Sequence, residues 1–285
     1  VLHWDGNIEH PHAYRAKGQV QKLALESQPA TPTPEFEHPW GVPGVRGLDA
    51  DFEFTQAAGR AQLTIKDGAV DLPGVFEEST LPLQELTGQL SWTLDGDRIQ
   101  VSMPNLRFAN ADAQGQAQLS WRTADPKTSP SNQLWPGIID LSGTLSRGQG
   151  TRVHRYLPQV VPPFTRQYVR EAVTAGEITS AQFVVRGDIW EFPFRRAGSG
   201  DFRIAAQVRN ATYAYVPASL TRDPDLPWPT LTQVNGELVI DRVSLQVNQA
   251  GGRLEQTPTL AFSKADARIA DLRAPVVAVG VELRG

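Results

Sequence analysis

Cysteine is absent from the sequence, and methionine occurs once among its 285 residues. The chain therefore has no disulfide, no thiolate ligand for a metal and no cysteine nucleophile. Apolar runs are also short. None approaches the roughly eighteen residues of a membrane-spanning helix, and no basic segment followed by an apolar one opens the chain. We therefore predict neither a disulfide-stapled fold nor a transmembrane helix within these residues.

An excess of positive charge is missing as well. The sequence has 27 Lys and Arg residues against 31 Asp and Glu residues, for a net charge of -4. No basic run with interleaved aromatic residues occurs, so we predict no nucleic acid partner. Apolar residues make up 40% of the sequence, which is enough to form an interior.

The two ends of the sequence look cut. It begins at Val1 and stops within an alternating run, PVVAVGVELRG. A strand pattern that stops abruptly continues naturally into further residues, so we expect the chain to be a piece of a longer protein. Targeting segments would then lie outside it.

Alternation of apolar and polar residues recurs along the whole chain. In residues 88–103, Leu90, Trp92 and Leu94 precede an Asp95-Gly96-Asp97 turn, and a second alternating stretch follows. Glycine and aspartate tolerate the backbone angles of a tight turn, which predicts a β-hairpin. The same pattern predicts strands at 48–54, 59–65, 115–121, 180–189, 200–208, 236–240 and 243–247. Glycines often precede the pattern, and we expect these to open strands: Gly47, Gly88, Gly115, Gly143, Gly200 and Gly236.

Only residues 162–173 show a helical pattern. Proline opens this stretch, and its apolar residues recur on one face, so we expect a short amphipathic helix on an end or edge of the sheet. Proline-rich stretches at 29–43, 124–136 and 216–229 predict long surface loops. One helix cannot cover some fifteen strands, so the apolar face either packs on a second sheet or stays open as a groove. The abrupt ends favour the open sheet.

Candidate catalytic and metal-binding groups are few. The histidines His3, His10 and His12, and the carboxylates Asp49, Asp51 and Glu53 on one strand face, are more simply solvated residues, since nothing nearby completes a cation shell. His154 lies near no nucleophile motif, and GQGTRV (148–153) lacks the third glycine and the following helix of a phosphate-binding loop. We predict no catalytic residue, no metal and no cofactor, and therefore no enzyme.

Apolar and aromatic residues on the alternating faces are the remaining candidates. Such residues form either an ordinary β core or the lining of an apolar groove. The candidate lining residues are Leu90, Trp92, Leu94, Ile99, Val101, Met103, Leu119, Trp121, Phe183, Phe202, Leu238, Ile240, Leu245 and Val247.

From about residue 84 onward, the order of motifs resembles the AsmA-like proteins, in particular the YhdP branch. The motifs are LTGQLSW (86–92), NADAQGQ (110–116), RYLP (155–158), RGDIWEFPF (186–194), GDFRIAAQVRNATYAY (200–215) and WPTLTQVNGEL (228–238). Residues 41–56 and 74–86 are similar too, so the resemblance covers most of the chain. Two features depart from the pattern: Tyr168-Val169 stands where Trp-Leu is expected, and residues 218–227 lengthen the approach to Trp228.

The resemblance implies a non-enzymatic segment of a bridge-like lipid transfer protein. Its implied fold is mostly β: a long antiparallel sheet curled into a taco-like groove, with one short amphipathic helix. Glycerophospholipids would slide along this groove between the inner and outer membranes, with their acyl chains as the partner of the apolar lining. The implied location is the periplasm, with an inner-membrane anchor outside these residues, and no envelope protein partner is identified.

The domain prediction is one continuous groove segment over 1–285, with sub-blocks 1–83, 84–150 and 151–285. A second hypothesis is a closed β-sandwich that spaces or scaffolds cell-envelope components and binds no lipid. Leu90→Asp separates the two, because a groove tolerates the charge in folding whereas a packed core unfolds.

Overall fold

The computed structural model describes residues 1–7, 10–31, 40–220, 228–273 and 277–284. These residues form fourteen strands, one α-helix and three short 3-10 helices. The strands are β1 (Leu2–Asn7), β2 (His10–Leu25), β3 (Gly44–Thr55), β4 (Ala58–Asp71), β5 (Thr80–Asp95), β6 (Arg98–Ala109), β7 (Ala113–Arg122), β8 (Ile138–Gln149), β9 (Val173–Asp188), β10 (Gly200–Tyr213), β11 (Leu231–Asp241), β12 (Ser244–Leu254), β13 (Thr257–Ile269) and β14 (Val277–Arg284). The helices are η1 (Gly150–Tyr156), α1 (Pro163–Ala172), η2 (Ile189–Glu191) and η3 (Ala218–Leu220).

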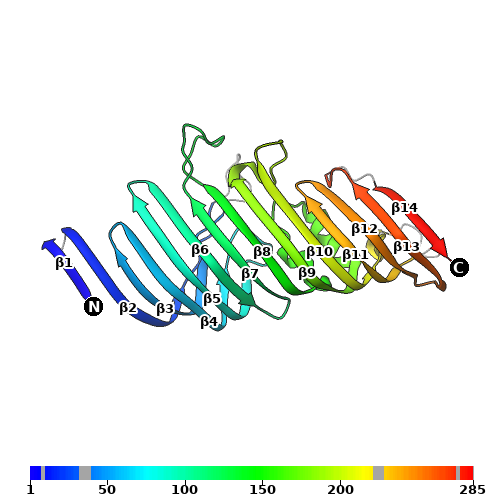
Figure 1. Cartoon of the computed structure of the whole chain (residues 1–285), viewed down its shortest axis with the longest axis horizontal. Coiled ribbons are helices and arrows are strands. Elements are labelled where there is room, and N and C mark those ends of the chain that lie inside the picture. The colour runs from blue at the N-terminus through cyan, green and yellow to red at the C-terminus, as the bar shows by residue number, and fades with distance from the viewer. Residues whose placement is uncertain (8–9, 32–39, 221–227, 274–276, 285) are drawn as a thin grey trace. The chain divides into compact units, whose positions relative to one another are not determined.

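The strands pair in chain order in one open sheet, so each strand lies beside its sequence neighbours (Figure 1). The chain divides into two compact units. Unit 1 comprises residues 1–143 and 184–201, and unit 2 comprises residues 144–183 and 202–285. The predicted sub-blocks 1–83, 84–150 and 151–285 remain a prediction.

The mostly β, antiparallel fold is confirmed, and so is the hairpin at residues 88–103. Asp95 pairs with Arg98 across a two-residue turn in which Gly96 has a φ of 57°. Glycine at the first central position is what a type II′ hairpin turn requires. Many strands are longer than the alternation predicts. β4, for example, extends from Ala58 to Asp71 rather than from 59 to 65.

The strands are longer because they continue past residues in the left-handed backbone region, where the alternation is interrupted. In unit 1 these are Lys22, Gly47 and Asp67, and in unit 2 they are Asn210, Gln233, Gln249 and Lys264. Pairing registers shift beside them, as at β-bulges. A bulge bends its strand and increases the local twist. The strands of each unit are therefore bent at these points, which curls the sheet within the unit.

A side chain on the next strand holds several of these bulges in place. In each case the left-handed residue of one strand donates its backbone N–H to the side-chain oxygen of an Asp or Asn residue on the next strand. That Asp or Asn lies two residues after the left-handed residue of its own strand. We call this contact a bulge clamp. The clamps are Lys22 to Asp49 (2.8 Å), Asn210 to Asn235 (3.0 Å) and Gln249 to Asp266 (2.8 Å).

The prediction that glycines open the strands is wrong for all but Gly200. Gly47, Gly88 and Gly236 lie inside strands, as do Gly115 and Gly143. Gly47 adopts a φ of 76° at a bulge. A Cβ atom on Gly236 would lie 2.9 Å from the Ala250 Cα atom, so the neighbouring backbone approaches too closely for a side chain. Glycine in these strands marks bulges and close approaches.

The fully buried core is small. Among the described residues, nine of the fifteen buried apolar residues are alanines, and Ile65 and Phe194 are the large side chains that are fully buried. The accessible surface is 17446 Å² for 31.2 kDa. A globular protein of that mass exposes about 12,000 Å². Most large apolar side chains of the described strands are half-buried rather than buried, so they are only partly covered by protein.

Helix α1 confirms the predicted amphipathic helix, one residue shorter at each end. In unit 2 it lies against the end of β10, where the Tyr168 and Tyr213 hydroxyls are 2.6 Å apart and Tyr168 also donates to the Tyr215 carbonyl. Burial, with the contact to Tyr168, raises the pKa of Tyr213. GQGTRV, interpreted as a loop, instead completes β8 and begins η1.

Candidate functional site

The apolar face of unit 1 is built from side chains that line up across the strands. Register partners on neighbouring antiparallel strands point to the same face, so alternate residues form rows perpendicular to the strands. Row 1 is Ala16, Phe54, Gly59, Trp92, Val101 and Trp121. Row 2 is Gly18, Phe52, Ala61, Leu90, Met103 and Leu119.

Two further rows continue the face toward the bulges. Row 3 is Val20, Ala50, Leu63, Gly88, Leu106 and Ala117. Row 4 is Leu23, Leu48, Ile65, Leu86, Phe108 and Gly115. All 24 positions are apolar or glycine, so the four rows form one surface without a charged group.

Burial increases along the strands toward the bulges. It starts from the strand ends that carry the Asp95-Gly96-Asp97 turn, which we call the hairpin edge. Leu94, which pairs with Ile99 beyond row 1, is 39% exposed. Leu90 in row 2 is half-buried, whereas Ile65 in row 4 is 1% exposed. The face is therefore open at the hairpin edge, and near the bulges Ile65 is covered while Leu48 and Leu86 beside it stay half-buried.

Unit 2 repeats this arrangement on its own strands. One row is Ile204, Ile240, Leu245 and Ile269, and the next is Ala206, Leu238, Val247 and Ala267. Phe202 belongs to the same face of β10, two residues before Ile204. Phe183 lies half-buried in β9.

The structure thus brings most of the candidate lining residues together within their units. Leu90, Met103 and Leu119 lie in row 2, and Trp92, Val101 and Trp121 lie in row 1. The sequence reasoning missed rows 3 and 4, together with Phe52 and Phe54. Their alternation is equally clear in LDADFEF and GRAQLTI, and following that pattern into the bulges could have found them. That any of these residues contacts lipid remains a prediction.

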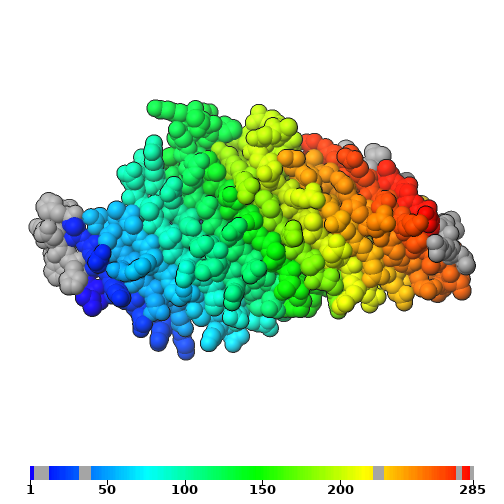
Figure 2. All heavy atoms as spheres, in the orientation of Figure 1, coloured from blue at the N-terminus to red at the C-terminus, as the bar shows by residue number. Residues whose placement is uncertain are grey.

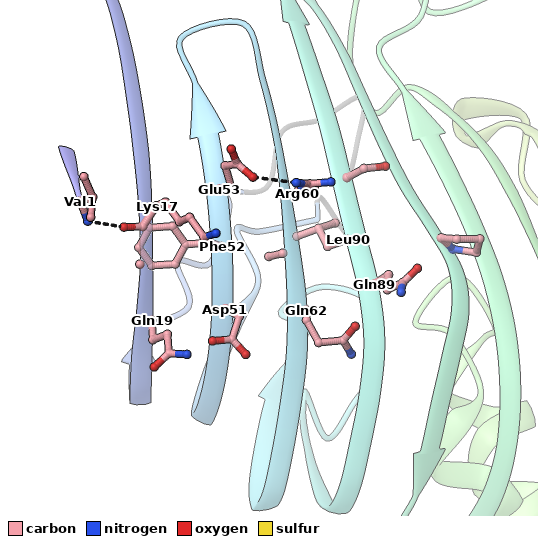
Figure 3. Close-up of a pocket in the computed structure, with 14 residues that line it drawn as sticks. Val1, Lys17, Gln19, Asp51, Phe52, Glu53, Arg60, Gln62, Gln89 and Leu90 are labelled. Carbon is pink, nitrogen blue, oxygen red and sulfur yellow. Dashed lines mark hydrogen bonds and ion pairs between the residues drawn. The ribbon is translucent and has the colours of Figure 1, made fainter. Parts of the chain in front are cut away.

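A shallow depression of about 720 Å³ lies across β2, β3, β4 and β5 in unit 1 (Figure 3). Its lining combines row 2 residues such as Phe52 and Leu90 with the polar positions beside them, among them Asp51, Glu53 and Arg60. The Phe52 ring comes within 3.0 Å of the place a Cβ atom on Gly18 would take. The depression is open, and charged and amide side chains contribute to its lining, so it is not a purely hydrocarbon-binding pocket.

The alternate residues of the same strands form polar rows. Gln19, Asp51, Gln62 and Gln89 lie in register across four strands, as Figure 3 shows. In the next polar row, Arg60 donates to Glu53 at 2.7 Å, and this hydrogen bond lowers the pKa of Glu53. The charged groups of this part of the sheet are therefore kept off the four apolar rows.

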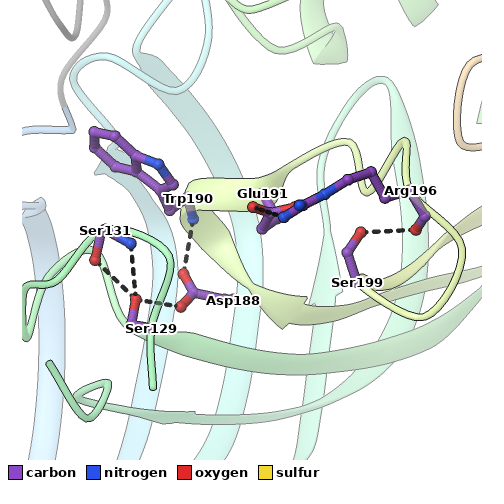
Figure 4. A network of polar contacts seen from close by, with 7 residues as sticks. All are labelled: Ser129, Ser131, Asp188, Trp190, Glu191, Arg196 and Ser199. Atoms are coloured by element: carbon purple, nitrogen blue, oxygen red, sulfur yellow. Dashed lines mark hydrogen bonds and ion pairs between the residues drawn. The ribbon is translucent and has the colours of Figure 1, made fainter. Parts of the chain in front are cut away.

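Two connections pack together at the hairpin edge of unit 1. Asp188 accepts hydrogen bonds from the Ser129 hydroxyl (2.6 Å) and from the Trp190 backbone N–H (3.0 Å) (Figure 4). The Ile189 N–H also donates to the Gly137 carbonyl. The connection between β7 and β8, green at the upper rim in Figure 2, is thus tied to the residues that follow β9.

The remaining polar candidates show no catalytic arrangement. No group of three or more metal-ligating side chains occurs among the described residues. Asp49 serves a bulge clamp and Glu53 pairs with Arg60. The side chains of His3, His10 and His12 lie outside the described residues. No described helix is both long enough and apolar enough to cross a bilayer.

The family assignment rests on the whole length of the chain. The family model described as YhdP protein matches residues 1–285. The chain belongs to the YhdP family. This confirms the AsmA-like assignment that the motifs predict, including the weakly similar first eighty residues. No curated protein and no solved structure matches the chain. Membership in the YhdP family is consistent with a lipid-transport type of protein.

Proposed function

We propose that the apolar rows bind the acyl chains of glycerophospholipids and let them slide from strand to strand. The chain is then a non-enzymatic segment of a bridge between the inner and outer membranes. The observation that carries this proposal is the uncovered apolar face, with four continuous rows in unit 1 and half-exposed large side chains. Family membership supports the same function.

The energetics favour such a surface for transport. Exposing one acyl methylene to water costs about 0.8 kcal/mol, so a chain of some fifteen methylenes costs on the order of 10 kcal/mol. A continuous apolar surface removes most of that cost at every step. The absence of charge within the rows leaves no strong local site at which a lipid would stall.

The location and attachment belong to the same proposal. A bridge of this kind works in the periplasm, with its anchor in the inner membrane outside these residues. The second candidate, a closed β-sandwich scaffold without lipid, requires a second layer over the apolar face. The described residues form one sheet, and their buried core consists mainly of alanine, so they favour the open groove.

Site-specific photocrosslinking in the full-length protein tests the proposal. A photoreactive amino acid at Trp92 probes row 1, and the same amino acid at Thr93 is the matched control, because Thr93 points to the opposite face one residue away. We expect phospholipid attached at 92 and little at 93. Equal capture at both positions, or none at 92 in a folded protein, would refute the lipid-conducting function.

A further inference from the structure

Row 1 of unit 1 differs from the deeper rows in its aromatic content. Tyr14 and Phe54 lie edge to face at 6.3 Å, and Phe54 lies 6.3 Å from Trp92 between ring centroids. Trp121 stacks on Trp135 at 4.9 Å with an interplanar angle of 26°. We call these five residues the aromatic row. Val101 fills the gap between Trp92 and Trp121.

The aromatic row follows the hairpin edge of the sheet. Phe54 is the penultimate residue of β3 and Trp121 the penultimate residue of β7. Polar turns follow directly, such as Asp95-Gly96-Asp97 after β5. The row therefore lies close to the polar rim, with the apolar pair Leu94 and Ile99 beyond it on β5 and β6.

Two tryptophans of this row have different surroundings at their indole N–H groups. The Trp121 indole N–H donates to the Pro136 carbonyl at 2.9 Å, which fixes the stack with Trp135. Trp135 itself is 56% exposed. No residue in the described part of the chain accepts a hydrogen bond from the Trp92 indole N–H, so that donor is available to a bound molecule.

The strand geometry gives the distance from the aromatic row to the rows near the bulges. Same-face residues are about 6.8 Å apart along a strand, so rows 1 and 4 are separated by about 20 Å. One leaflet of bilayer hydrocarbon is about 15 Å thick. An acyl chain that starts at the aromatic row thus ends between rows 3 and 4, short of the fully buried Ile65.

Aromatic side chains with one polar atom concentrate where hydrocarbon meets polar groups, as in the aromatic belts of membrane proteins. From this placement we infer that the aromatic row binds the glycerol and ester region of a phospholipid, and so fixes how deeply the lipid sits. This inference rests on the proposed function. It assigns the Trp92 N–H to an ester oxygen, while rows 2 to 4 contact progressively more distal methylenes.

Two photoreactive phospholipids test this assignment in the full-length protein. They differ only in the position of a diazirine, which is placed either beside the ester or at the end of the acyl chain. Mass spectrometry then maps the attached residues. We expect the ester-proximal probe on the aromatic row and the terminal probe between rows 3 and 4, near Leu63 and Leu48.

A variant adds a readout of the contact itself. Trp92→Leu should reduce capture of the ester-proximal probe by about twofold to tenfold, the effect of losing one aromatic contact. Thr93→Ala, on the opposite face of β5 from Trp92, is the control and should leave capture unchanged. If Trp92→Leu fails to fold, the two-probe map of the unaltered protein still decides.

The possible results separate this inference from the proposed function. If both probes attach to the apolar face with the same or the reversed depth order, the aromatic row does not hold the ester region, although lipid binding stands. If neither probe attaches, both the inference and the proposed function are wrong.

Discussion

Two large-to-small substitutions in unit 1 distinguish an open apolar face from a packed core. Ile65 in row 4 is 1% exposed, so Ile65→Ala should lower the free energy of unfolding by about 3 kcal/mol, within the usual range for a buried aliphatic residue. Leu90 in row 2 is half-buried. Full burial of a leucine stabilises by about 1.5–3 kcal/mol, so Leu90→Ala should cost only about 1 kcal/mol.

Urea unfolding followed by far-ultraviolet circular dichroism measures both changes. The two residues belong to the same unit, so the same transition is compared. Thr93→Ala, on the polar face of β5, is the control and should shift the midpoint little. In the full-length protein, Leu90→Asp should keep the fold and lose lipid capture. Equal losses of about 3 kcal/mol for Leu90→Ala and Ile65→Ala would show that the face is a closed core.

Three further predictions concern polar contacts. Asp49→Ala removes the acceptor for the exposed Lys22 N–H and should cost about 0.5–1.5 kcal/mol in urea unfolding, and Asp49→Asn should restore most of it. No loss would mean that the clamp contributes nothing. The hydrogen bond from Ser27 lowers the pKa of Asp71. The stabilisation by the Asp71 carboxylate is therefore complete above the unfolded-state pKa of about 3.9 and is lost as pH falls below it. Asp71→Asn should flatten the fall in unfolding free energy at acid pH, and an unchanged fall contradicts the assignment. Tyr168→Phe removes two hydrogen bonds of α1, so amide exchange in 163–172 should accelerate about tenfold while exchange in unit 1 stays unchanged.

Local chemistry explains what the sequence could predict. The hairpin at Asp95-Gly96-Asp97 has both a turn signal and clean alternation on each side, so its strands, register and apolar face are predictable. Helix α1 was predictable from its opening proline and the spacing of its apolar residues. The lining residues Leu90, Trp92 and Leu94 follow from the same alternation that defines β5.

The part of each strand beyond its bulge could not be predicted from the alternation of apolar and polar residues. At a left-handed residue the apolar spacing changes from two to three, as between Val208 and Ala211 in β10 and between Val247 and Ala250 in β12. Alternation then continues on the opposite parity, so a period-two pattern appears to stop. The left-handed residues are mostly Lys, Gln and Asn rather than glycine, and none of them by itself indicates a bulge.

The contacts that distinguish row 1 from the other rows could not be predicted from residue spacing alone. That Trp135 stacks on Trp121 depends on a fourteen-residue separation closed by the turn around Ser129, which no local pattern specifies. Conversely, the glycines that looked like strand openings are positions where a ring or a backbone lies close. Gly236 is an example, because a Cβ atom there would lie 2.9 Å from the Ala250 Cα atom.

The bulge clamps make the architecture modular. Each clamp joins a strand to the next one, so a pair of strands carries its own bend and needs no distant residue to maintain it. Two consecutive strands could therefore be removed or duplicated by recombination without altering the cross-section, because the chain returns to the same edge. Loss of a single strand would reverse every later strand and exchange the two edges. Evolution can thus lengthen or shorten such a sheet only in steps of two strands, with its width held constant.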